Sequence, residues 1–271
     1  MGRQIALNTA IHGYEVAVCE SFPAARESME NWKEEYLAGR VAKGRMTQEQ
    51  VDTVKARFSV TDDLAVACKD SDIVIEAIIE DKQAKSELLG KVSKLVRPDT
   101  VIATNSSFMV SSTFADVVDH PERLANLHYF APALVMKLVE VVGGEHTSQE
   151  TLDKLMEFGR STGKTPALVK KEEDGFIVNN ILKVIKEEAY RLVNEGVCSL
   201  EDLDVAVELG LGHPMGPFKI DDMNGLDVRY NVLKRRYEET GIKSNGFDMI
   251  EKQYQQGRYG KKTKHGFYDY E

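Results

Sequence analysis

Two apolar runs and the segment between them decide the fold: DIVIEA at 72–77, a helix-like segment at 82–96, and VIATN at 101–105. The two runs are short and rich in β-branched residues, which is typical of buried strands. The segment between them is stopped by Pro98, because the residue before a proline avoids the helical conformation. A strand, a helix and a second strand in this order predict a βαβ unit with parallel strands.

The same alternation continues on both sides of this unit. Before it, the patterns predict helices at 4–11, 24–39 and 48–57, a helical turn at 64–68, and strands at 15–20 and 58–61. After it, they predict strands at 124–130, 137–142 and 166–169 and a helix at 151–162, with the loop 131–133 joining the first two strands. Thr47 and Gln50 form a capping box at the start of one helix. The sequence therefore predicts a mostly parallel, doubly wound α/β sheet.

The strand patterns stop after about residue 172. The segment 176–194 carries an apolar stripe at helical spacing, and further helices are predicted from Ser199, around Asp221, and over 228–239 and 247–255. We therefore expect two domains, an α/β domain over residues 1–172 and an all-α domain over residues 173–271.

Composition excludes several classes of partner. The net charge is 35 − 44 = −9, whereas nucleic-acid and anionic-membrane surfaces call for basic patches. The chain holds no run of 18 apolar residues and no signal-peptide pattern at its start. Its three cysteines are far apart, which excludes a disulfide framework and a CxxC metal site. These features predict a cytoplasmic protein with no nucleic-acid, membrane or metal partner.

Polar residues gather where the predicted strands end. Glu20, the segment 76–80, the segment 105–107 and His128 each follow or close a strand. Ligands of open α/β sheets bind beyond the carboxyl ends of the strands, so these residues are the candidate site.

Several of these segments carry a family resemblance. The chain resembles the L-3-hydroxyacyl-CoA dehydrogenase family, and in particular its bacterial 3-hydroxybutyryl-CoA dehydrogenases. The resemblance covers essentially the whole chain through DIVIEAIIED (72–81), ATNSS (103–107), LHYFAPALVMKLVEVV (127–142), GFIVNN (175–180), LGLGHPMGPF (209–218) and GKKTKHGFYDY (260–270). It implies a Rossmann-like NAD-binding domain, a helical dimerisation domain, an acyl-CoA substrate and a homodimer.

His128 and Glu140 are the candidate proton-transfer pair. A carboxylate bonded to one imidazole nitrogen fixes the tautomer, and the other nitrogen can then accept a hydroxyl proton near neutral pH. A structural histidine beside an unrelated glutamate is the alternative. The catalytic His–Glu pair of the family falls on these two positions, so the resemblance implies that His128 is the base and Glu140 orients it.

Two further residues are candidates for substrate contacts. Ser107 could donate to a substrate oxygen or hold the imidazole, although a serine after a strand is often a helix cap. Asn179 could equally be an exposed helix residue. The resemblance implies that both position the substrate. The sequence departs from the family pattern at Phe108, where Ser is usual, and at Ala131, where Asn is usual.

The cofactor residues are assigned in the same way. An acid at the end of the second family strand accepts hydrogen bonds from the ribose 2′-hydroxyl and repels a 2′-phosphate, so Glu20 favours NAD over NADP. Glu80, Lys85, Asn105 and Gly2 match positions that line the cofactor cleft. For the charged residues among them, solvated surface charges are the alternative.

The glycine fingerprint of the family is incomplete. Members begin with an apolar strand and Gly-x-Gly-x-Met-Gly, whereas Met1-Gly2 match only the end of that motif. Losing about five buried apolar residues would cost on the order of 10 kcal/mol, against a total stability of about 5–15 kcal/mol. We expect that the true protein begins upstream of an internal Met1. If the chain as written is the product, poor folding and weak NAD binding are expected.

The reaction that the resemblance implies is NAD-dependent oxidation of (S)-3-hydroxyacyl-CoA to 3-ketoacyl-CoA, or its reverse, with a short chain such as 3-hydroxybutyryl-CoA. The pathway, β-oxidation of fatty acids or butanoate metabolism, stays open. One alternative is a relative acting on a free hydroxy acid or a carnitine-like substrate. The other is a catalytically impaired binding or structural protein, because the fingerprint is incomplete.

Overall fold

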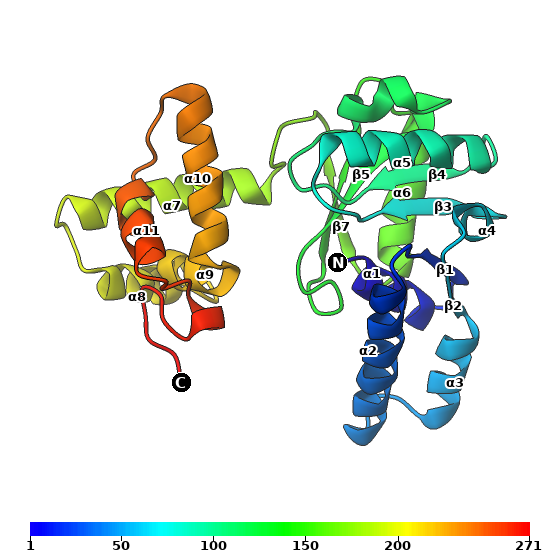
Figure 1. Ribbon diagram of the computed structural model, residues 1–271, viewed down its shortest axis with the longest axis horizontal. Coiled ribbons are helices and arrows are strands. Elements are labelled where there is room, and N and C mark those ends of the chain that lie inside the picture. Colours follow the sequence, from blue (N-terminus) through cyan, green and yellow to red (C-terminus); the bar gives the residue numbers. More distant parts are fainter. The chain divides into compact units, whose positions relative to one another are not determined.

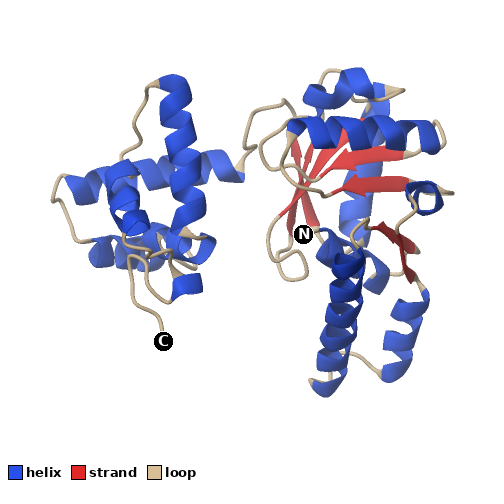
Figure 2. Ribbon diagram, in the orientation of Figure 1, coloured by secondary structure: helices blue, strands red, loops and turns tan.

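All strands lie in the first of two units. The computed structural model describes residues 1–271, and its units are Met1–Ile177 and Val178–Glu271 (Figure 1). The first unit combines strands with helices and the second is built from helices (Figure 2). The expected Rossmann-like domain followed by a helical domain is confirmed, with the change between units five residues beyond the expected position.

The sheet is interrupted near its middle. Strand β1 (Val16–Cys19) pairs in parallel with β2 (Phe58–Thr61) and with no other strand. The second sheet has the order β3-β4-β5-β6-β7, with bounds Ile73–Glu76, Val101–Thr104, Leu124–Tyr129, Leu138–Val142 and Thr165–Val169. All its pairs are parallel except β5–β6. Helix α1 (Gly2–Ile11) opens the chain, so the single doubly wound sheet expected from the alternation is present as two sheets.

The helices of the first unit begin where the sequence signals predict. They are α2 (Pro23–Ala42), α3 (Gln48–Ala56), α4 (Leu64–Cys68), α5 (Lys82–Leu95) and α6 (Gln149–Ser161), with the 3-10 turns η1 (Ser111–Val117) and η2 (Pro121–Arg123). The capping box is confirmed: Thr47 Oγ1 accepts from the Gln50 amide at 3.2 Å, and Gln50 Oε1 accepts from the Thr47 amide at 2.9 Å.

Helices cover both faces of the five-stranded sheet. One face packs Ala103 and Leu127 against Ile5 of α1 and Leu155 of α6. The other face packs Ile102 and Leu124 with α5 and η1, through Leu89, Val92 and Phe114. Strands β4 and β5 are buried on both faces, as the apolar run at 101–104 predicts.

The second unit packs its helices around an apolar core and also buries several carboxylates. Its helices are α7 (Val178–Asn194), α8 (Leu200–Leu211), α9 (Pro217–Asn224), α10 (Leu226–Thr240) and α11 (Phe247–Gln255), followed by the 3-10 turn η3 (Lys261–Thr263). Asp222 accepts from the amides of Phe267 and Tyr268, each at 2.9 Å. Asp204 accepts from the Phe218 amide at 3.1 Å. The motifs at 209–218 and 260–270 thus serve the interior of this unit.

Gly216 shows how tight this packing is. A Cβ atom there would lie 2.3 Å from Asp204 Oδ1, closer than any side chain tolerates.

No helix in the structure has the length and apolar character that crossing a bilayer requires.

Candidate active site

The register of β5 and β6 places His128 directly opposite Glu140. Cross-strand partners of an antiparallel pair project to the same face, so the two side chains meet. His128 Nδ1 lies 2.9 Å from Glu140 Oε2, and both side chains are buried. The connection between the strands spans residues 130–137 and is longer than the predicted tight loop 131–133. The contact therefore comes from strand register, not from a tight turn.

Ser107 extends this pair into a chain of three side chains. An ionised carboxylate only accepts, so Glu140 assigns the proton of the neutral imidazole to Nδ1 and leaves Nε2 as an acceptor. His128 Nε2 lies 3.0 Å from Ser107 Oγ, whose hydroxyl can donate to it. The open nitrogen of the ring is thus aimed at the end of β4, where Ser107 follows the strand.

Glu140 has a second partner that sequence reasoning missed. Its Oε1 accepts from the backbone N–H of Ile177 at 3.1 Å. Phe176 just before it has φ = 55°, a left-handed conformation that costs about 1–2 kcal/mol for an L-residue. The Phe176 ring lies beside the imidazole, with centroids 5.3 Å apart, and Phe130 lies 4.6 Å away by the same measure. Phe176 and Ile177 belong to the motif GFIVNN, in which the family resemblance points only to Asn179.

A buried ion-pair network lies at the ends of β3 and β4. Lys85 is 1% exposed, and its Nζ lies 2.7 Å from Glu76 Oε1 and 3.2 Å from Glu80 Oε2. Thr104 donates to Glu76 Oε2 at 2.6 Å, and Ser106 donates to Glu80. The charge of Lys85 is engaged by two carboxylates, and its cofactor contact stays a prediction. The part played by Glu76 was not predicted.

Burial and hydrogen bonding act in opposite directions on Glu80. Burial raises its pKa, whereas the hydrogen bond from Ser106 and the positive charge of Lys85 lower it, and the net result is a lowered pKa. Glu80 therefore stays ionised at neutral pH and keeps a negative charge at the wall of the cleft.

The two residues before Ser107 are held by further hydrogen bonds. The Asn105 amide donates to the Glu76 carbonyl at 2.8 Å, and Asn105 Oδ1 accepts from the Tyr129 amide at 2.9 Å. Ser106 Oγ accepts from the Met109 amide at 2.9 Å. The turn-capping function that was the alternative for Ser107 thus falls to Ser106, and the Ser107 hydroxyl is directed to His128.

Four of the predicted residues line one cavity of about 320 Å³. Its lining residues are Met1, Ala77, Ile78, Glu80, Lys85, Asn105, Ser107 and Phe108. Phe108 is 54% exposed, so the departure from serine adds an accessible aromatic ring to this wall. The cavity lies at the carboxyl ends of β3 and β4, where ligands of such sheets bind.

The residues present fit a dinucleotide. Met1, the N-cap of α1, makes no side-chain capping bond and the first turn holds no acid, so the helix start suits a pyrophosphate. Gly2 follows Met1, and a Cβ there would be 3.6 Å from that of Ala77. Glu20 closes β1, with its Oε1 accepting from the Phe22 amide at 3.0 Å. A carboxylate at that strand end suits a ribose hydroxyl.

Two further positions singled out in the sequence belong to other elements. Asn179 belongs to the first turn of α7, in the second unit, and its substrate contact stays a prediction. Ala131 is exposed in the connection between β5 and β6. Lys164 Nζ holds that connection by donating to the carbonyls of Ala133 and Met136, the latter at 3.0 Å.

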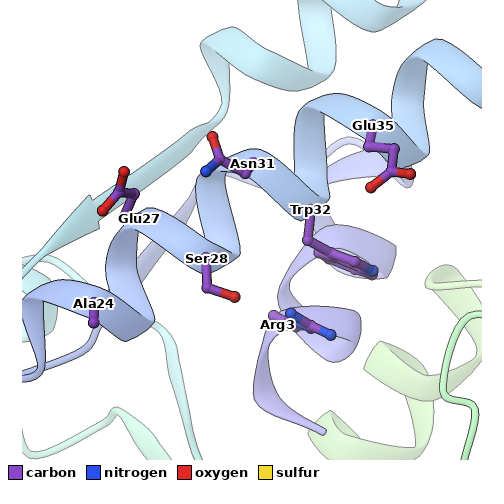
Figure 3. A pocket seen from close by; sticks show the side chains of 7 residues that line it. All are labelled: Arg3, Ala24, Glu27, Ser28, Asn31, Trp32 and Glu35. Atoms are coloured by element: carbon purple, nitrogen blue, oxygen red, sulfur yellow. The ribbon is translucent and has the colours of Figure 1, made fainter.

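A wider hollow of about 510 Å³ lies between α1 and α2 (Figure 3). The guanidinium of Arg3 stands 4.6 Å from the ring centre of Trp32, and the two side chains face each other in the view. Two carboxylates also line the hollow, from Glu27 before Trp32 and from Glu35 after it on α2. This hollow contains none of the predicted site residues, whereas the smaller cavity is lined by Ser107.

Comparisons with known proteins cover the full chain. Residues 1–173 match the family model described as 3-hydroxyacyl-CoA dehydrogenase, NAD binding domain, and residues 175–270 match 3-hydroxyacyl-CoA dehydrogenase, C-terminal domain. The 3-hydroxybutyryl-CoA dehydrogenase of Clostridioides difficile is 34% identical over 274 residues, covering 100% of this chain and 96% of the relative.

Two other comparisons point to the same family. The mitochondrial hydroxyacyl-coenzyme A dehydrogenase of Homo sapiens is 34% identical and covers 100% of this chain and 88% of its own length. The crystal structure of (S)-3-hydroxybutyryl-CoA dehydrogenase PaaH1 from Ralstonia eutropha has a TM-score of 0.90 and 30% identity, covering 100% of this chain and 95% of that one.

Proposed function

We propose a reaction for this chain from the premise that it belongs to the 3-hydroxyacyl-CoA dehydrogenase family of NAD-dependent enzymes. It interconverts short-chain (S)-3-hydroxyacyl-CoA and 3-ketoacyl-CoA, and His128 is the general base. The observation that carries the assignment of the base is the chain Ser107–His128–Glu140, with its two contacts of 3.0 and 2.9 Å. The short acyl chain is supported by the relatives named 3-hydroxybutyryl-CoA dehydrogenase.

In the oxidation, His128 Nε2 takes the proton of the substrate 3-hydroxyl. Glu140 holds the imidazole through Nδ1 and stabilises the imidazolium that forms. NAD, when bound, accepts the hydride from C3 of the substrate. In the reduction, the imidazolium returns the proton to the forming 3-oxygen.

Ser107 lies on the same side as Nε2 and donates either to the imidazole or to the 3-oxygen when substrate is present. Asn179 binds the thioester or 3-oxygen region. The start of α1 would hold the pyrophosphate of NAD, and Glu20 would bind its ribose. Glu80, Lys85 and Asn105 form the wall of the cofactor cleft.

The experiment that tests this function follows NADH oxidation with acetoacetyl-CoA and, in parallel, with acetoacetate. Turnover of the thioester alone is the expected result. Turnover of the free acid instead would replace this function with that of a hydroxy-acid dehydrogenase. A folded protein that turns over neither substrate nor longer 3-ketoacyl-CoA thioesters would favour a binding or structural function.

Cofactor choice is tested in the same assay with Glu20→Ala. Without the carboxylate, the preference for NADH over NADPH should narrow by about tenfold, because the ribose loses an acceptor and a 2′-phosphate loses its repulsion. An unchanged preference would remove Glu20 from the cofactor site.

We also propose a homodimer formed through the second unit. Its helices expose large apolar side chains, including Ile181 and Val184 on α7 and Leu209 on α8, which is 83% exposed. Large apolar surface of this kind marks protein–protein contacts. Sedimentation equilibrium should give twice the mass of one chain, and Leu209→Asp should shift the protein toward the monomer. A monomeric wild-type protein would contradict the proposal.

A further inference from the structure

Glu140 is fully buried, and its carboxylate has a partner on each oxygen. Oε2 contacts His128, and Oε1 accepts from the backbone N–H of Ile177. The imidazole can keep its orientation only while this carboxylate keeps its own. The segment that ends at Ile177 is therefore part of what orients the base.

The direction of the Ile177 N–H is set by two consecutive left-handed residues. Gly175 has φ = 82° and Phe176 has φ = 55°. Glycine adopts such angles freely, whereas phenylalanine meets steric resistance. A strained residue persists where its surroundings hold it, and such positions cluster at functional sites.

The surroundings of Phe176 explain why the strain persists. Its side chain is buried in a cluster with Val142 and Val169, the last residues of β6 and β7. Its ring lies beside the imidazole at 5.3 Å between centroids and 56° between planes. One residue thus turns the next amide onto Glu140 and contacts His128 with its ring.

The connecting segment is fixed at its other end as well. Glu172 Oε1 accepts from the Ser111 hydroxyl at 2.8 Å and from the Ser112 amide at 2.9 Å. The segment from Glu172 to Ile177 is therefore anchored to η1 at one end and to Glu140 at the other. Phe176 lies between these anchors.

We propose that Phe176 is a positioning residue for the His128–Glu140 pair, acting through its left-handed backbone and its ring. Its consequence for turnover rests on the proposed function. Its ring contacts the imidazole of His128, and its backbone directs the Ile177 amide to Glu140. Both contacts act on the base, so the loss of Phe176 should lower kcat and leave KM unchanged.

The test uses three variants of the full chain. Phe176→Gly keeps the backbone angle accessible and removes the ring, while Phe176→Leu restores bulk without aromaticity. Phe158→Leu is the matched control, because Phe158 on α6 is also buried but packs in another cluster. With acetoacetyl-CoA and NADH, F176G should lower kcat by about tenfold or more with KM within about twofold. F176L should recover most of kcat, and F158L should change neither constant.

A spectroscopic measurement keeps the test independent of turnover. The Nδ1–H proton of His128 is identified by proton NMR through its absence in His128→Asn, and its exchange with water is measured. F176G should speed this exchange, and F176L should do so less. An unchanged exchange rate in F176G would overturn the proposal, and F176L takes its place if F176G does not fold. This result would overturn the proposal even if acetoacetyl-CoA were not a substrate. A rise in KM at constant kcat would also overturn it and make Phe176 a substrate contact.

Discussion

Replacing Glu140 by glutamine tests how the carboxylate controls the base. The new side chain has one acceptor and one donor end, whereas the two atoms that face it, His128 Nδ1 and the Ile177 amide, are both donors in the wild-type arrangement. If the amide oxygen turns to Ile177, the NH₂ group faces Nδ1 and requires it to accept. The ring proton then moves to Nε2, and the imidazole can no longer take the substrate proton.

The other orientation of the glutamine keeps the correct tautomer but sets its NH₂ group against the Ile177 N–H. Leaving that partly buried donor unpaired costs about 1–3 kcal/mol, so the inactive tautomer is favoured by about 5- to 150-fold. The imidazolium also loses a charge-assisted bond of about 1.5–3 kcal/mol, which is a further factor of about 10–150. We therefore expect kcat to fall by about 10²–10⁴ in Glu140→Gln.

The assay is NADH oxidation with saturating acetoacetyl-CoA, with thermal unfolding to show that the variant folds. NADH affinity should not change, because Glu140 is buried and does not line the cavity beside Ser107. Glu157→Gln, on the exposed surface of α6, is the control and should keep wild-type kcat. A Glu140→Gln enzyme with more than a tenth of the wild-type kcat would refute the tautomer argument.

Three further predictions concern stability. Lys85→Met leaves the buried Glu76 carboxylate without its cation and should lower the free energy of unfolding, measured by urea titration, by about 3–5 kcal/mol. A loss below about 1 kcal/mol would contradict the importance of the buried pair. The pKa of Glu80 is lowered in the folded state, so its ionised form stabilises the protein above the unfolded value of 4.5, and this contribution is lost as pH falls through the folded pKa. The wild type should therefore exceed Glu80→Gln in stability at pH 7 and lose that advantage on acidification, and a constant difference would show that Glu80 does not contribute in this way. Asp222→Asn replaces a carboxylate that accepts from two backbone amides and from Tyr270, and it should cost about 2–3 kcal/mol and speed tryptic cleavage after Lys261; an unchanged cleavage rate would show that Asp222 does not anchor the chain end.

Local patterns predicted most of the elements. Helix starts such as the Thr47 capping box depend on residues three apart, and buried strands such as 101–104 depend on a short apolar run. Both signals act within one or two turns of chain, so the structure agrees with them to within a few residues. The division of the sheet is different, because it depends on which strands find a partner across the fold.

The site was predicted through motifs rather than geometry. His128, Glu140 and Ser107 came from matches to a family pattern, and their residue types already indicated proton transfer. Glu76 was singled out only as part of the segment 76–80, without a partner, and Phe176 was missed, because a glutamate inside a strand and a phenylalanine before a helix have ordinary local patterns. Glu76 matters because it pairs with Lys85, nine residues on, and Phe176 matters because its ring contacts the imidazole of His128, 48 residues away in the chain.

The sequence by itself determined the order of strands and helices, the change to an all-helical second part, and the chemical groups available at the strand ends. These follow from side-chain periodicity and residue type, which are local properties. Only the tertiary structure decided that β5 and β6 run antiparallel in the register that joins His128 to Glu140. It also decided that the Ile177 amide donates the second hydrogen bond to the Glu140 carboxylate. Strand register and the pairing of buried charges are settled by burial of whole faces and by desolvation, which bring together residues that are distant in the chain.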